Sequence, residues 1–197
     1  KMIDPLIYRI IALSFSLLFF FAALHKLGNR GNFKAILLAY KILPAGTLNI
    51  VSLLIPVVEL TLGLAWLVFS LFLVQYNLVP LVSMMLLGSY TFSIALNLIR
   101  GRNYIDCGCG FAKNSGNDIQ QLSSGLVVRN SILILATLVA AFPSTARELG
   151  FIDHFALLMA TLTLVLLYGG FNQLLSNRSA INTWRNIPEK AAEGSHA

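Results

Sequence analysis

Long apolar runs separated by short polar stretches make up most of this chain. A helix that crosses the roughly 30 Å hydrocarbon core of a bilayer needs about 20 residues, at about 1.5 Å of rise per residue. Five runs approach or exceed this length: Leu6–Leu27, Leu48–Val74, Leu78–Ile99, Leu126–Phe142 and Phe155–Leu175. Such runs are far longer than transmembrane β-strands, and a helix satisfies its own backbone hydrogen bonds in lipid. The pattern therefore predicts an all-α integral membrane protein, a bundle of about five transmembrane helices.

The stretches that connect these runs differ in kind. The first, residues 28–47, carries apolar residues at helical spacing, has Lys34 and Lys41 on one side and reaches Pro44 near its end. It predicts a short helix, which either lies in the membrane interface or packs as a connector. Only residues 75–77 join the second and third runs, so these two helices are predicted to be antiparallel neighbours.

The same pattern predicts one domain. Residues 1–177 form a single transmembrane helical domain, and residues 178–197 form a polar C-terminal tail whose last residues resemble an artificial extension. The first run ends in "HKLGNR" without a small-residue cleavage site, and further runs follow it. We therefore expect it to be a retained helix and not a signal peptide.

Composition supports the membrane class. Hydrophobic residues make up 57% of the chain and charged residues 11%, against about 25% charged residues in soluble domains. Lipid must therefore be the solvent for much of the surface. The net charge of +6 comes from basic residues that flank apolar runs, and no nucleic-acid-binding motif accompanies them, so we expect no nucleic-acid partner.

The basic residues also bear on orientation. With five spans, the first connector, the segment 100–124 and the tail lie on one side of the membrane, and most Lys and Arg residues fall within them. The positive-inside rule would place that side in the cytoplasm. The rule fails where basic residues serve a functional site, so the orientation stays open.

The two cysteines of the chain, Cys107 and Cys109, lie on either side of Gly108 in the longest polar segment. A disulfide prefers Cα atoms about 5.5–6 Å apart, so a ring closed over one residue is strained and easier to reduce. The spacing therefore predicts a redox-active pair. Arg102 would favour a thiolate and Asp106 would oppose it, which leaves the charge state of the thiols open.

Two other interpretations of the cysteine pair carry less weight. An inert structural disulfide is disfavoured by the strained spacing. Zinc prefers four ligands in a tetrahedral site, and only His25 and Asp106 are plausible additions to the two thiols. We therefore predict no metal site.

Other candidate site residues lie in or at the ends of the spans. Glu59 lies near the middle of the second span, where a carboxylate either marks a functional site or is hydrogen-bonded to fix helix packing. Arg129 and Asn130 open the fourth span; Arg129 could steady a thiolate, bind a quinone carbonyl, pair with Glu59 or extend to lipid phosphates. His25 and Lys26 end the first span on the same membrane face, where His25 could relay a proton or simply pack.

The stretch "LNLIRGRNYIDCGCGF", followed by "LVVRN", resembles the MauE family of methylamine-utilisation membrane proteins, within the wider DoxX-like group. "ALHKLGN" and "LPAGTLNIVSLLIPVVELTLG" are similar to that group too. The resemblance implies a DoxX-like helical fold with a cysteine-containing loop between helices three and four. It implies Cys107 and Cys109 as an exchanging pair, while Arg102, Arg129 and Glu59 match the family pattern without assigned roles.

The resemblance also implies a helper protein. It would act with a thioredoxin-like, MauD-type partner in the maturation of a client protein with disulfides, the small subunit of methylamine dehydrogenase. A periplasmic client would favour thiols that reach the outer face, against the orientation that the basic residues indicate.

The leading hypothesis is a multi-pass protein of the cell (inner) membrane that acts as a thiol–disulfide oxidoreductase. A partner would exchange with Cys107 and Cys109 through a mixed disulfide. One cysteine pair cannot form a two-pair relay, so the electrons pass to a quinone, to a second protein or across the membrane with the pair. A quinone is the favoured cofactor because it needs only an apolar cleft with a few polar groups. Two alternatives stay open: a non-enzymatic scaffold or chaperone subunit, and DoxX-like sulfur or thiosulfate:quinone chemistry with a persulfide on either cysteine.

Overall fold

The computed structural model describes residues 3–72, 77–102, 122–145 and 147–193 of the chain. Within these ranges all regular elements are helical, and strand-like pairing is limited to an isolated bridge between Ile3 and Ser144. The elements are α1 (Pro5–Gly28), α2 (Arg30–Tyr40), the short 3₁₀ helix η1 (Ala45–Thr47), α3 (Leu48–Phe72), α4 (Leu78–Ile99), α5 (Ser124–Ala140) and α6 (Phe151–Glu193). The predicted all-α membrane class is confirmed.

The predicted spans correspond to helices, with one difference in length. Four helices are long and apolar enough to cross a membrane, namely α1, α3, α4 and the Phe151–Arg178 part of α6. Helix α5 is apolar but has 17 residues, or about 26 Å, at the lower limit for a span. Helix α6 continues beyond the predicted end of its span at Leu175 to Glu193, so the start of the expected polar tail is helical.

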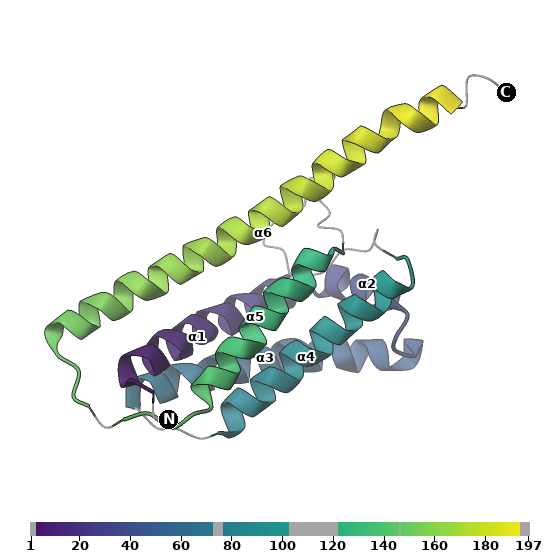
Figure 1. The fold of residues 1–197 in the computed structure, drawn as a ribbon. Coiled ribbons are helices and arrows are strands. Elements are labelled where there is room, and N and C mark those ends of the chain that lie inside the picture. The colour runs from purple at the N-terminus through teal and green to yellow at the C-terminus, as the bar shows by residue number, and fades with distance from the viewer. Residues whose placement is uncertain (1–2, 73–76, 103–121, 146, 194–197) are drawn as a thin grey trace.

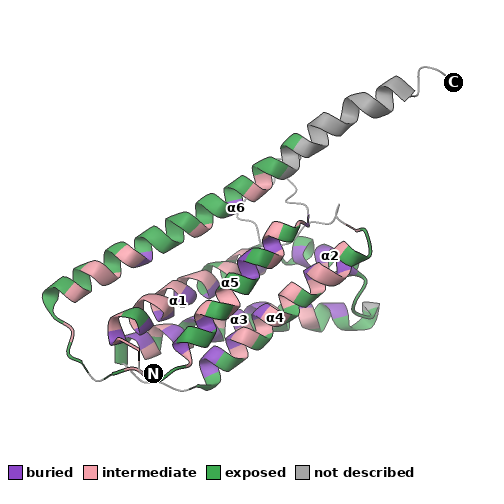
Figure 2. Ribbon diagram, in the orientation of Figure 1, coloured by how far each residue is buried: buried purple, intermediate pink, exposed green. Residues whose placement is uncertain are grey.

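Two helix pairs form the bundle. Helix α1 packs along α3 and α4 packs along α5, with α2 at the end where α1 and α4 finish (Figure 1). Helices α3 and α4 are antiparallel and meet where Trp66 Nε1 donates a hydrogen bond to Ser83 Oγ (3.0 Å), although each packs more extensively against another helix. Helix α6 contacts α1, extends past the bundle and is exposed along most of its described length (Figures 1 and 2).

Helix α2 resolves one of the two alternatives for the first connector. Its side chains Phe33, Ile36 and Tyr40 are buried, and the helix packs on α3. Lys34 and Lys41 are exposed on the other side. The helix is therefore a packed connector that covers the end of the bundle.

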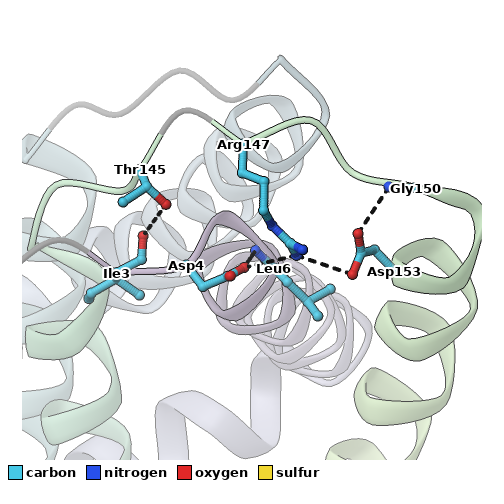
Figure 3. A network of polar contacts seen from close by, with 7 residues as sticks. All are labelled: Ile3, Asp4, Leu6, Thr145, Arg147, Gly150 and Asp153. Carbon is cyan, nitrogen blue, oxygen red and sulfur yellow. Dashed lines mark hydrogen bonds and ion pairs between the residues drawn. The ribbon is translucent and has the colours of Figure 1, made fainter.

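A polar network ties the start of the chain to the connection between α5 and α6 (Figure 3). Asp4 caps α1 by accepting a hydrogen bond from the Leu6 amide (2.8 Å), and it also pairs with Arg147 (3.4 Å). Arg147 reaches Asp153 (3.1 Å), whose carboxylate accepts the Gly150 amide (2.9 Å) at the start of α6. Both helices therefore begin with a capped amide end.

The seam between α1 and α3 follows from helical periodicity. Buried residues recur every three or four positions on α1: Tyr8, Ala12, Phe15, Phe19, Ala23 and Lys26. The matching stripe on α3 includes Ser52, Pro56, Glu59, Gly63 and Trp66. The Trp66 ring stacks on Phe15 (5.6 Å between centroids) at one end of the seam. Because Lys26 continues the same stripe, the packing that buries the aromatic residues also carries Lys26 into the interface.

Gly63 sets the closest approach of these two helices. A Cβ atom at this position would lie 3.1 Å from the Phe20 backbone nitrogen and 3.2 Å from the Ser16 carbonyl oxygen. Small residues let helix backbones approach closely in membranes, where packing and polar contacts drive helix association. Gly63 therefore fixes the distance between α1 and α3.

We predict that Gly63→Ala separates α1 from α3 and lowers stability by about 1–3 kcal/mol, the usual cost of overpacking. Thermal unfolding of the purified protein in detergent measures the effect. Gly88→Ala is the matched control, because a Cβ there meets open space. Equal melting temperatures for the two variants would contradict the close-packed seam.

The C-terminal end of α4 is closed by a glycine in the left-handed region. Gly101 has a φ of +70°, its amide donates to the Leu98 carbonyl (3.0 Å), and the Arg102 amide donates to the Asn97 carbonyl (2.9 Å). These two hydrogen bonds define a Schellman motif, which satisfies carbonyl groups that the helix end leaves unpaired. The motif directs the chain into the segment that carries the cysteines.

We predict that Gly101→Ala destabilises the protein by about 1–2 kcal/mol, because an L-residue is strained at this φ. Gly28→Ala, at the end of α1 in open space and without a positive φ, is the control. A Gly101→Ala variant that melts with the control would show that the helix ends differently.

Candidate functional site

An ion pair lies between α1 and α3 at the end of the seam. The ammonium of Lys26 (5% exposed) contacts Oε1 of Glu59 (1% exposed). Tyr90 of α4 donates a hydrogen bond from its hydroxyl to the same carboxylate oxygen (2.7 Å) and accepts one from Lys26 Nζ (3.2 Å). Lys26 also lies 4.7 Å from the centroid of the Tyr90 ring and 5.4 Å from that of Phe33, within cation–π range. Four helices thus contribute to one buried charge centre.

Burial makes this pairing energetically important. An ionised side chain removed from water costs several kcal/mol unless a partner and further hydrogen bonds compensate it. Here Glu59 has Lys26 and Tyr90, and Lys26 has Glu59, Tyr90 and two aromatic faces. The hydrogen-bonded, packing role predicted for Glu59 describes this structure, because its carboxylate joins three helices. The carboxylate also lines a cavity.

Arg129 forms a second buried polar group between α5 and α6. Its guanidinium donates to Oδ1 of Asn172 (2.5 Å) and to Oδ1 of Asn130 (3.2 and 3.3 Å). It also lies 5.5 Å from the centroid of the Tyr168 ring. Arg129 is 5% exposed, so the predicted alternative in which it extends to lipid phosphates does not describe this structure. The group instead joins the mostly exposed α6 to the bundle.

A small cavity of about 40 Å³ lies between the two polar groups. Its polar lining comprises His25, Lys26, Glu59, Tyr90, Arg129, Asn130 and Tyr168. A cavity needs about 10–15 Å³ to hold one water molecule, so this one has room for water. Cations, a carboxylate, an imidazole and phenols converge on it, so the site can stabilise a small anion or thiolate and move a proton.

Sequence reasoning identified five residues that the fold brings together around this cavity, namely His25, Lys26, Glu59, Arg129 and Asn130. Arg102 lies at the end of α4 and does not line the cavity. The predicted residues Asp106, Cys107, Gly108 and Cys109 lie outside the described residues.

Tyr90, Tyr168 and Asn172 belong to the site but were not predicted from the sequence. Asn172 carried a usable signal, because an amide inside an apolar span needs a hydrogen-bond partner there. The two tyrosines carried none, since a tyrosine in a span is equally compatible with ordinary packing.

The polar site extends from the middle of α3 and α4, where Glu59 and Tyr90 lie, toward one end of the bundle. Lys26 is near the C-terminal end of α1, and Arg129 is near the N-terminal end of α5. The described residues that flank the cysteine segment belong to this same end: Arg102 follows α4, and Leu122 is buried beside Leu126 and Ile94. The described residues on both sides of the cysteine segment therefore lie toward the end that carries Lys26 and Arg129.

Within the described part of the chain, no group of three or more His, Cys, Asp or Glu side chains is placed to hold a metal ion. The chemistry that the described residues offer is therefore that of charges, phenols and an imidazole.

Comparison with known proteins gives a consistent result. A family model described as "Methylamine utilisation protein MauE" matches residues 4–143, which include α1 to α5. Methylamine utilization protein MauE of Paracoccus denitrificans is 31% identical over 155 residues (75% of this chain, 78% of that protein), and that of Paracoccus versutus is 32% identical over 166 residues (84% and 85%). The MauE protein of Methylophilus methylotrophus is 35% identical over 106 residues, or 54% of each chain. No solved structure matches the chain.

We predict that Lys26→Met destabilises the protein by about 3–5 kcal/mol, because it leaves the Glu59 carboxylate buried without its cation. The double variant Lys26→Met/Glu59→Gln should recover most of that loss. Unfolding in a denaturing detergent titration measures both. Lys34→Met, which removes an exposed lysine of α2, is the control, and a Lys26→Met variant as stable as this control would refute a structural role for the ion pair.

Proposed function

The chain belongs to the MauE family, and from this premise we propose that it takes part in methylamine utilisation as a membrane thiol–disulfide oxidoreductase. The exchanging groups are Cys107 and Cys109. The partner is a thioredoxin-like protein of the MauD type, and the outcome is disulfide formation in a client protein. The family membership supports the first part of the proposal, and the chemistry of the cysteine pair and the polar site supports the rest.

The observation that carries the proposal is the convergence of Lys26, Glu59, Tyr90 and Arg129 on one cavity, with Lys26 and Arg129 toward the end of the bundle where α4 ends and α5 begins. Thiol–disulfide exchange requires a thiolate, which nearby cations stabilise. It also requires a group that takes up and returns a proton when a thiol ionises. Buried cations and ionisable groups at membrane depth are costly and tend to mark functional sites.

The exchange of the disulfide takes place in two steps. One thiolate of the partner attacks a sulfur of the Cys107–Cys109 disulfide, the S–S bond breaks, and a mixed disulfide forms while the other cysteine leaves as a thiolate. The second partner thiolate then attacks the mixed disulfide, so the partner ends oxidised and the cysteine pair ends as a dithiol. Two electrons move to this chain, and Arg129 provides positive charge for the thiolate that is released.

We predict that Cys107→Ser and Cys109→Ser each reduce exchange with a reduced thioredoxin-like partner to background. When a single variant is mixed instead with the oxidised partner, its remaining thiolate attacks the partner's disulfide, and one of the two variants should accumulate the mixed disulfide as a covalent adduct detectable by mass spectrometry, because the second cysteine that would resolve it is missing. Ser131→Ala, at an exposed serine of α5, controls for handling of the variants. A double cysteine variant that still supports client maturation would instead identify the protein as a scaffold or chaperone subunit.

A further inference from the structure

A second and larger cavity of about 280 Å³ lies between α2, α3 and α4. Its walls are mainly apolar and include Phe33 and Tyr40 of α2, Val51 and Ile55 of α3, and Ile94 of α4. Ligand sites in proteins are typically apolar clefts of about 300–1,000 Å³ with a few placed polar groups. The cavity is therefore large enough for one ring-sized group but not for a long molecule.

The polar residues on the lining include Ser89 and Ser93 of α4, together with Lys26 and Tyr90, which also line the smaller cavity. The Ser89 hydroxyl donates to the Leu86 carbonyl of its own helix (2.7 Å). An ammonium has three N–H donors, of which Glu59 and the Tyr90 hydroxyl take two among the described residues. The third can serve a ligand. Lys26 thus offers a hydrogen-bond donor to the cavity, and this donor favours a ligand that carries a hydrogen-bond acceptor.

Charge narrows the ligand class. The positive charge of Lys26 is already balanced by Glu59, so an anionic ligand would add an uncompensated buried charge, which is costly. A neutral acceptor such as a carbonyl oxygen avoids that cost. The rings of Phe33, Tyr40 and Tyr90 on the lining favour a flat ring, which can stack or pack edge-on against them.

The opening of the cavity has room for the tail of a longer molecule whose ring occupies the cavity. Ile42 and Leu43 line the cavity and are each 37% exposed. They follow α2 and are apolar, so a hydrocarbon tail attached to a ring in the cavity can pass over them into lipid. A ring with carbonyl groups and an apolar tail is the chemistry of a membrane quinone.

We propose that this cavity binds the head-group ring of a membrane quinone, with one carbonyl oxygen hydrogen-bonded to Lys26. The binding site stands on the cavity alone, whereas its role as the electron acceptor rests on the function proposed above. In that role, the Cys107–Cys109 dithiol loses two electrons and two protons as its S–S bond forms, and the quinone gains two of each to become a quinol. Lys26 lies where it can protonate the carbonyl oxygen, and Glu59 and Tyr90 connect it to the smaller cavity.

The first test is a calorimetric titration of the purified protein, held in quinone-free nanodiscs, with ubiquinone-2. Wild type should bind at one saturable site. Val51→Phe places a ring in the cavity and should weaken binding at least tenfold, while Val57→Phe, at an exposed valine of the same helix, should not. Unfolding curves establish that both variants are folded, and equal affinities for the two variants would overturn the proposed site.

A second variant separates a quinone site from a groove for lipid tails. Tyr90→Phe removes a hydroxyl that positions Lys26 and should weaken ubiquinone-2 binding about three- to tenfold, the range of one lost hydrogen bond. Binding of dodecane, which has no acceptor, should not change. If dodecane displaces ubiquinone-2 with equal affinity and Tyr90→Phe leaves quinone binding unchanged, the cavity holds acyl chains and the proposal is wrong.

The two proposals fail in different ways. The double variant Cys107→Ser/Cys109→Ser should bind ubiquinone-2 as wild type does but should not reduce it after treatment with dithiothreitol and removal of the reductant. If the wild-type protein binds ubiquinone-2 but does not reduce it, the proposed electron transfer is wrong and the proposed binding site stands. No saturable binding by wild type would reject the site, whatever the thiol exchange assay shows.

Discussion

The contact between Lys26 and Glu59 is the constraint on which the rest of the bundle depends. In lipid, apolar helices gain little from contacting one another in place of lipid tails, so packing detail and polar contacts decide which helices associate. Two buried charges that must meet allow only one register of α1 against α3. Gly63 lets the backbones come close enough, and the aromatic residues around Trp66 fill the other end of the seam. Tyr90 then attaches α4 to the same centre.

Two cavities lie on either side of Lys26 and Tyr90. On one side is a small space that Arg129 and His25 also line, and on the other a larger space bounded by α2. Lys26 and Tyr90 line both. A group bound on either side would therefore act on the same hydrogen bonds between Lys26, Glu59 and Tyr90. Arg129 and Asn172 add α6, which is otherwise largely exposed to its surroundings.

Much of the fold could be read from the chain. The span Leu78–Ile99 has the bounds of α4, and the other spans correspond to helices because about 20 apolar residues leave the backbone few alternatives in lipid. The continuation of α6 to Glu193 was not foreseen, since hydropathy reports where a helix is apolar and not where it stops. For the candidate site, a charged residue within a span was signal enough for Glu59 and Arg129. The tyrosines Tyr90 and Tyr168 gave no such signal.

The sequence by itself determined the class of the protein, the number of apolar segments, the spacing of the single cysteine pair and which ionisable residues enter the membrane. These properties depend on composition and local order along the chain. Only the tertiary structure decided that the ion-pair partner on Glu59 is Lys26, and that Arg129 contacts Asn172 across to α6. The physical reason is that residues facing lipid and residues facing another helix are equally apolar here. Hydropathy therefore cannot say which helices are neighbours, and three-dimensional packing must.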